Sequence, residues 1–232
     1  GLQARTSFKG QTGTCNYNVL TTAVNNCKTY VAAAMDYINV NAYSGTKLKV
    51  IANLYYPGYN ADNVQSSCND PVTGAKVNLR DKFLPAITQM NYWMCEYARQ
   101  KGFQCTDNFA EYMGADYDSN GDGAIDSEAL KYVLGESEAS YVTRITSTLR
   151  PTLRDANTHF VSSTSSFDYI QSDDVHPTFT GGTVSAGFFG GTTGTGAPRY
   201  TAFAGGKSPI WNQYGHERMG WSLSVFSPPS PF

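Results

Sequence analysis

The hydrophobic positions along the chain follow a helical period, then a strand-like run, and then repeat that order. Residues 19–38 carry apolar side chains at spacings of three and four, which is typical of an amphipathic helix. Residues 48–58, LKVIANLYYPG, form a nearly continuous apolar run and predict a strand that is buried on both faces. A second amphipathic helix is predicted over 81–101, and FQCTDNF at 103–109 predicts another short strand.

The order helix, strand, helix, strand predicts an α/β layer structure with parallel strands. Residues 59–80, between the first strand and the second helix, are polar and loop-like. Residues 127–154 are again predicted to be helical, with a break before Pro151, and HFVSS at 159–163 is a candidate strand. The Gly- and Thr-rich residues 181–206 have no helical period and predict a long surface excursion.

Composition narrows the class of protein. A chain of 232 residues that is 41% hydrophobic and 16% charged suits a soluble fold, which we expect to be one domain over 1–232. The net charge of −2 gives no electrostatic reason to bind nucleic acid or an anionic membrane. No apolar run approaches the length of a transmembrane segment. The polar start GLQARTSFKG lacks both a signal-peptide pattern and a methionine, so we expect a processed chain.

The cysteines favour an oxidising compartment. None of the five belongs to a C-x-x-C pair, so the sequence gives only weak support for a zinc ribbon or a thioredoxin-like redox motif. Scattered cysteines in a chain rich in Thr, Ser, Asn and Gly predict disulfides and a secreted or periplasmic protein. Five is an odd number, so one thiol is either free, as a buried structural thiol would be, or paired with another polypeptide. The five are Cys15, Cys27, Cys68, Cys95 and Cys105.

An acidic loop over residues 116–128, DYDSNGDGAIDSE, has oxygen ligands at alternate positions, as a calcium loop requires. The last position departs from the EF-hand: the twelfth residue is Ala129, Glu128 comes one residue early, and Asp116 is a possible substitute. The alternative is an acidic glycine-rich turn; the ligand match favours structural Ca²⁺. The predicted ligands are Asp118, Asn120, Asp122, the carbonyl of Ala124, Asp126 and Glu128.

The stretch SDDVHPT at 172–178 places one of only three histidines three residues after an aspartate and directly before a proline. Histidine can take and return a proton near neutral pH, and a neighbouring aspartate can hold its ring in one tautomer. The alternative is a surface turn, which Asp, Ser and Pro favour on local grounds. In its α/β context, Asp173-Asp174-Val175-His176-Pro177 resembles the final Asp-x-x-His motif of the SGNH (GDSL-type) hydrolases.

This resemblance implies a flavodoxin-like three-layer fold with a parallel sheet and the cleavage of esters. KVIANLYYPG resembles the central strand of that family, and NQYGHERMGW at 212–221 resembles the helix after the histidine motif. By the resemblance, His176 is the general base and Asp173 orients it. His159 and His216 are interpreted as structural.

The chain departs from the family in lacking the G-D-S serine motif and the G-x-N-D oxyanion motif, and it has no G-x-S-x-G. We therefore expect a companion N-terminal chain to supply the serine, the oxyanion donors and the first strands. The resemblance implies an ester substrate, which is an ester of a lipid, a polyester or an acetylated glycan; the sequence does not distinguish these. Two rivals remain: a calcium-stabilised extracellular binding module without catalysis, whose support includes 16 tyrosines, and a hydrolase that uses a serine of this chain.

Overall fold

The structure is a computed structural model that describes residues 2–10, 13–43, 45, 48–59, 68–114, 126–153, 219 and 223. Contacts divide the chain into two compact units. The described residues up to Asp107, together with Tyr132–Pro151, belong to the first unit, and Asn108–Lys131 belongs to the second. The expectation of one domain stays a prediction, as do the elements expected at 159–163 and 181–206, which lie outside the described residues.

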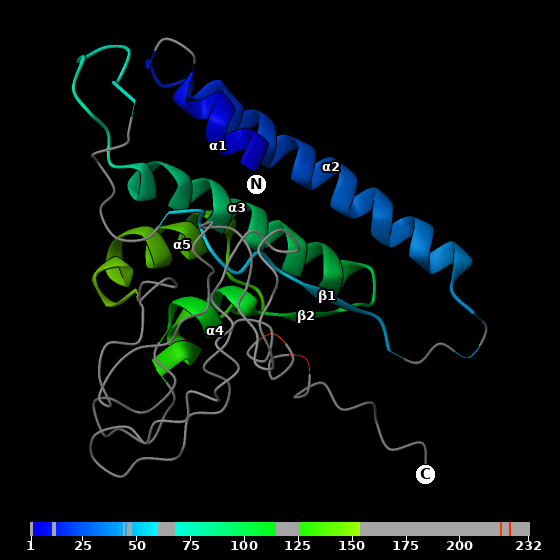
Figure 1. The fold of residues 1–232 in the computed structure, drawn as a ribbon. Helices are drawn as coiled ribbons and strands as arrows, with labels where there is room; N and C mark the ends of the chain where they lie inside the picture. The colour runs from blue at the N-terminus through cyan, green and yellow to red at the C-terminus, as the bar shows by residue number, and fades with distance from the viewer. Residues whose placement is uncertain are drawn as a thin grey trace, which may run out of the picture. The chain divides into compact units, whose positions relative to one another are not determined.

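The described part of the first unit consists of helices and one small sheet (Figure 1). Its regular elements are α1 (Leu2–Lys9), α2 (Asn18–Asn41), β1 (Val50–Ala52), α3 (Leu79–Gln100), β2 (Gln104–Thr106), α5 (Glu138–Thr143) and the π-helical turn η2 (Arg144–Thr148). A 3₁₀ turn, η3 (Arg150–Thr152), follows η2. The second unit contains helix α4 (Asn108–Met113) and the 3₁₀ turn η1 (Asp126–Leu130).

The two long helices occur where the apolar periodicity predicts them. Helix α3 begins after Asn78, which has an extended backbone and caps the helix. Its side-chain oxygen accepts a hydrogen bond from the Asp81 amide at 3.1 Å. Helix α3 ends before Gly102, which adopts φ 74°, a conformation that suits glycine at a helix C-terminus. Helices α2 and α3 contact each other along much of their length (Figure 1).

Strands β1 and β2 pair in parallel, with Val50 opposite Gln104 and Ile51 opposite Cys105. Because α3 connects them, the segment is a strand–helix–strand unit, as the alternation of patterns predicts. The predicted strand over 48–58 is wrong in extent, since only Val50–Ala52 is regular strand. The three residues of β1 are half-buried and are not enclosed on both faces. The apolar run therefore overestimated both the length and the burial of the strand.

The helical stretch predicted over 127–154, with a break before Pro151, is interrupted much earlier than predicted. The structure has η1, then a turn, and then α5, which starts after the N-cap Ser137. Gly135 in the turn adopts φ 85°, which a continuous right-handed helix does not contain. The hydroxyl of Ser137 accepts a hydrogen bond from the Ser140 amide at 3.1 Å and so fixes the new helix start.

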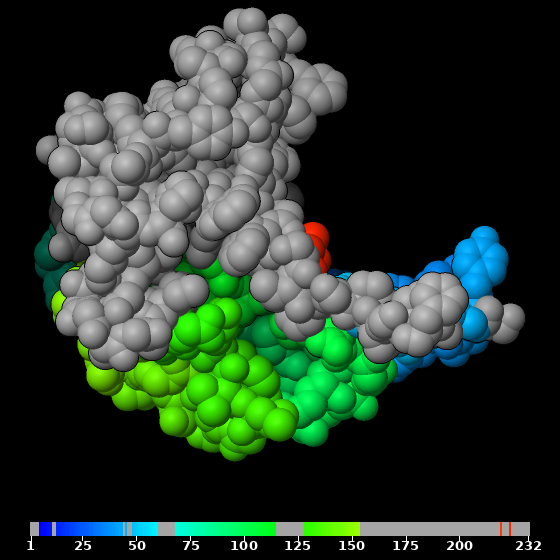
Figure 2. Space-filling model, turned by 90° about the horizontal axis from the view of Figure 1, so that it is seen from below, coloured from blue at the N-terminus to red at the C-terminus, as the bar shows by residue number. Residues whose placement is uncertain are grey.

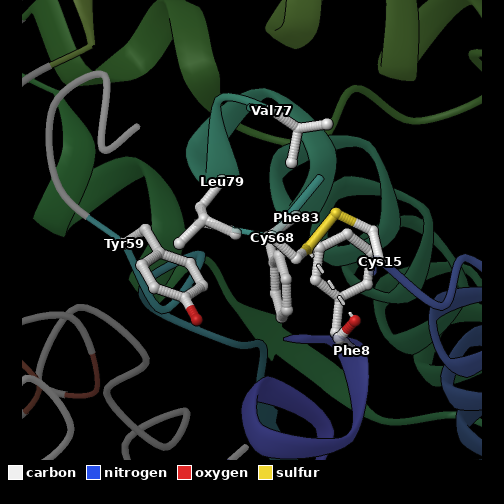
Figure 3. Close-up of a cluster of buried hydrophobic side chains, with 7 residues drawn as sticks. All are labelled: Phe8, Cys15, Tyr59, Cys68, Val77, Leu79 and Phe83. Atoms are coloured by element: carbon white, nitrogen blue, oxygen red, sulfur yellow. Dashed lines mark hydrogen bonds between the residues drawn. A yellow bond between two sulfur atoms is a disulfide. The ribbon is translucent and has the colours of Figure 1, made fainter. Parts of the chain in front are cut away.

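Among the described residues of the first unit, apolar side chains form two buried clusters. In one, the ring of Phe83 on α3 packs edge-on against Phe8 and Tyr59, beside a disulfide that joins Cys15 to Cys68 (Figure 3). The other cluster joins α2, α3 and the sheet. Its members are Met35, Ala98 and Phe103, with Val31, Ile51, Tyr97 and Cys105 packed against them.

The C-terminal end of α2 projects from the surface in the space-filling view, where it is light blue (Figure 2). Val40 and Tyr43 in this part of the chain are largely exposed. Ala34 and Ile38, which belong to the predicted apolar stripe of α2, are exposed as well. The buried side of α2 is therefore centred on Val24 and Met35 and is narrower than the sequence pattern predicts.

Candidate functional site

The predicted catalytic pair, Asp173 and His176, lies outside the described residues, so its geometry stays a prediction. The same holds for four of the predicted calcium ligands: Asp118, Asn120, Asp122 and Ala124. Asp126 and Glu128 fall in the 3₁₀ turn η1.

Glu128 is exposed and forms a close ion pair with Lys131, three residues further on. The Lys131 ammonium also lies 3.4 Å from a carboxylate oxygen of the buried Glu111 on α4. Within the part of the chain that the structure describes, no three histidine, cysteine or carboxylate side chains converge as metal ligands would. The calcium loop therefore stays a prediction, and Glu128 already has a cationic partner.

The described structure does show a buried polar cluster at the carboxyl ends of β1 and β2. Asn53 directly follows β1, and Asp107 directly follows β2. The side-chain amide of Asn53 donates to Oδ1 of Asp107 at 2.8 Å, and the two residues are only 2% and 9% exposed. Parallel strands carry their polar, ligand-binding side chains at this end of the sheet in open α/β folds.

Two further contacts fix this end of the sheet. The backbone amide of Tyr132 donates to Oδ2 of Asp107 at 2.8 Å, so both carboxylate oxygens of Asp107 accept a hydrogen bond. Asn91 on α3 donates to the Leu54 carbonyl at 2.9 Å and accepts from the Leu54 amide at 2.8 Å. The chain that leaves β1 is therefore tied to β2 and to α3 through side-chain amides.

A buried carboxylate on α3 extends the cluster. Glu96 accepts hydrogen bonds from the Arg99 guanidinium, from the Tyr132 hydroxyl at 2.6 Å and from Gln100 at 2.8 Å. The bond from Arg99, which outweighs the cost of burial, lowers the pKa of Glu96 to about 2. Burial and the bond to Glu96 raise the pKa of Tyr132 to about 12. At neutral pH Glu96 is therefore an anion and Tyr132 a neutral phenol. These fixed states suit structural support better than proton transfer.

Tyr141 of α5 lies beside these groups and is fully buried, and its ring packs against Tyr92 and Tyr132. Burial, followed by the charge of Asp107, raises the pKa of the Tyr141 phenol well above its usual value. Its hydroxyl has no hydrogen-bond partner among the protein atoms of the described residues. Asn53, Asp107 and Tyr132 were not among the residues that the sequence predicted for a site; the available signal was a polar residue at the end of each strand-like run.

The cysteines confirm the predicted disulfides. Cys15 is joined to Cys68, and Cys95 on α3 is joined to Cys105 on β2. Cys27 on α2 is the odd thiol, and it is free and half-buried. Burial raises its pKa to about 11, so the thiol is protonated at neutral pH and a weak nucleophile. None of the helices in the described chain has the length and apolarity needed to cross a bilayer.

Comparison of the chain with protein-family models, with curated proteins and with solved structures gave no match in any of the three.

Proposed function

We propose that this chain is the part of a serine-type carboxylic ester hydrolase that supplies its Asp–His pair. The observation that carries the proposal is the motif Asp173-x-x-His176-Pro177, which follows a helix–strand–helix–strand segment and resembles the last motif of the SGNH (GDSL-type) hydrolases. A flavodoxin-like layered fold belongs to the same proposal.

Three features of the first unit support the proposal. Strands β1 and β2 are parallel and joined by α3, which is the building block of such a fold. Asn53 and Asp107 gather at the carboxyl ends of these strands, the edge at which open α/β sheets bind ligands. The two disulfides suit the proposed secreted or periplasmic location. These features support the class of fold; the assignment of the base depends on the motif.

In the proposed mechanism, a serine hydroxyl attacks the ester carbonyl while His176 removes its proton. Asp173 stays ionised, holds the imidazole in one tautomer and stabilises its charged form. Because the 232 residues contain no G-D-S or G-x-N-D motif, the serine and the oxyanion donors come from another stretch of polypeptide. The loop 116–128 binds Ca²⁺ as a structural ion, which favours the folded state by mass action.

Replacing His176 by alanine tests the assignment, with the other two histidines as matched controls. In the native assembly, we expect His176→Ala to lower the turnover of a soluble nitrophenyl ester by about 10³-fold or more, since members of a triad act as a unit. His159→Ala and His216→Ala should keep turnover within a fewfold of the unmodified protein. Far-UV circular dichroism should be the same for all four proteins. A His176→Ala protein with near-native turnover would remove this histidine from the mechanism.

A second candidate function is an extracellular binding module that stacks sugars on exposed aromatic rings. Tyr30 and Tyr37 on α2 are 68% and 70% exposed and lie seven residues apart, on one side of the helix. The two functions are separated by a serine-directed fluorophosphonate, because a hydrolase is labelled and inhibited by it and a binding module is not.

A further inference from the structure

The N-terminal halves of α2 and α3 enclose a surface groove of about 400 Å³. The helices run in the same direction there, since Leu20 packs near Phe83 while Met35 packs near Ala98 further along. The described lining residues are Tyr17, Leu20, Thr21, Val24, Asn25 and Lys28 from the side of α2, and Lys82, Pro85, Ala86 and Gln89 from α3. From Tyr17 to Lys28 the groove extends along about 17 Å of helix.

Apolar and polar side chains divide the groove into a floor and a rim. Val24 and Ala86 are buried, and Leu20 and Pro85 are half-buried, so the floor is aliphatic. Thr21 and Asn25 are exposed on the rim. A volume of this size lies within the range of small-molecule sites.

The charges of the lining are of one sign, because it contains Lys28 and Lys82 and its described residues include no acid. Lys28 is already engaged: its ammonium lies 3.5 Å from Glu138 and 4.6 Å from the centre of the Trp93 ring. The Lys82 ammonium lies over the Tyr17 ring at 5.4 Å and has no carboxylate partner within the described residues. Within the described residues, the groove therefore presents at its start a cation that forms no ion pair.

Two acids, Asp81 and Asp70, line a surface hollow together with Lys82 and have hydrogen-bond partners of their own. Asp81 accepts a hydrogen bond from Arg150 at 2.6 Å. Asp70 accepts one from the Tyr17 hydroxyl at 2.7 Å and two from the backbone of its own turn. The first turns of α2 and α3 add positive helix-dipole charge at the same end. The hydrogen bonds of Asp81 and Asp70 leave both groups ionised, but no carboxylate oxygen of the described residues forms an ion pair with the Lys82 ammonium, so an anionic group can approach it directly.

We propose that this groove binds an alkyl carboxylate, with the carboxylate at Lys82 and the alkyl chain along Leu20, Val24 and Pro85. The head group makes a charge-assisted hydrogen bond, and the chain covers the aliphatic floor. A cationic amphiphile is disfavoured at Lys82, and a short anion such as acetate leaves the floor uncovered. The inference stands on the groove alone and does not depend on ester hydrolysis.

The test is calorimetric titration of the native protein with decanoate below its micelle concentration. Decanoate should bind with 1:1 stoichiometry, while decyltrimethylammonium and acetate should show no binding. Lys82→Gln should weaken decanoate binding about tenfold, and Lys82→Arg should restore it to within about threefold, because arginine keeps the charge. Lys28→Gln should change the affinity less than Lys82→Gln, since Glu138 already neutralises Lys28.

Lys49→Gln is the matched control, because Lys49 is a surface lysine that also lies over an aromatic ring, that of Phe103, and does not line the groove. It should leave the affinity unchanged. Lys82 is exposed, so its substitution should leave the melting temperature unchanged. Equal affinity for decanoate and decyltrimethylammonium would overturn the proposal, as would equal losses in Lys82→Gln and Lys49→Gln.

Discussion

Asp107 joins the ends of the two strands, and its removal is the sharpest test of the first unit. Its two carboxylate oxygens accept hydrogen bonds from the Asn53 side chain and the Tyr132 backbone, each at 2.8 Å. In Asp107→Ala both donors lose this acceptor at a site that is almost closed to water. A buried donor without an acceptor costs about 1–3 kcal/mol. With two donors and partial entry of water, we expect a loss of about 3 kcal/mol in the free energy of unfolding.

Substituting Asn53, which donates to Asp107, measures how much of this loss in unfolding free energy belongs to one of the two hydrogen bonds. Asn53→Ala removes one donor and leaves the Tyr132 amide bonded, so we expect a loss of about 1.5–2 kcal/mol. Because Asn53 and Asp107 are in direct contact, the double variant should lose less than the sum of the single losses, by about 1 kcal/mol or more. Asn39→Ala is the matched control: this asparagine is exposed and donates to the Lys101 carbonyl at 3.0 Å, and its loss should stay within about 0.5 kcal/mol.

Urea unfolding followed by far-UV circular dichroism measures these values by linear extrapolation. The slopes against urea concentration should be equal among the variants, so that the midpoints report stability. An Asp107→Ala protein within about 0.5 kcal/mol of the unmodified protein would contradict a structural role for this carboxylate. Additive losses in Asn53→Ala and Asp107→Ala would contradict the coupling between the two residues.

Three further predictions concern pH, the disulfides and calcium. The pKa of Glu96 is about 2 in the folded protein against an ordinary value of 4.5, so its stabilising contribution is complete above about pH 4.5 and disappears as the pH falls toward 2. Because Arg99 is half exposed, we expect this contribution to be about 1–2 kcal/mol and to be missing in Glu96→Gln, as acid titration of stability would show. Replacing both cysteines of the Cys15–Cys68 bridge, which spans 53 residues, should lower the free energy of unfolding by about 4 kcal/mol. Replacing those of the Cys95–Cys105 bridge, which spans 10 residues, should lower it by about 3 kcal/mol. Chemical denaturation of the two variants measures both losses. Asp122→Asn should lower the melting temperature in calcium far more than it lowers ester turnover, and an unchanged melting temperature with and without chelator would contradict the calcium loop.

The sequence was sufficient for features that depend on local patterns. The apolar period of α2 and α3 marks both helices to within a few residues. The second helix was predicted to end at residue 101, and α3 ends at Gln100, with Lys101 as its C-cap, because Gly102, with its positive φ, stops the helix locally. The parallel pairing of β1 with β2 also followed from the order of the elements.

Features that depend on partners distant in the chain were not predictable in this way. The apolar run at 48–58 does not show which residues find a neighbouring strand, and only Val50–Ala52 does so. The contact between Asn53 and Asp107 joins residues 54 positions apart, so neither pattern alone contains it. The prediction over 127–154 followed the helical period of the apolar residues and gave no weight to Gly135. In the structure, Gly135 has a positive φ and lies in the turn that separates η1 from α5.

The central claim is that His176 acts on a serine that another stretch of polypeptide contributes. Fluorophosphonate labelling of the native material, followed by mass spectrometry of the labelled peptides, tests it most directly. We expect one labelled serine, in a G-D-S context outside these 232 residues, and the labelling should be lost in His176→Ala. The absence of any label, or a label on a serine of this chain, would contradict the account.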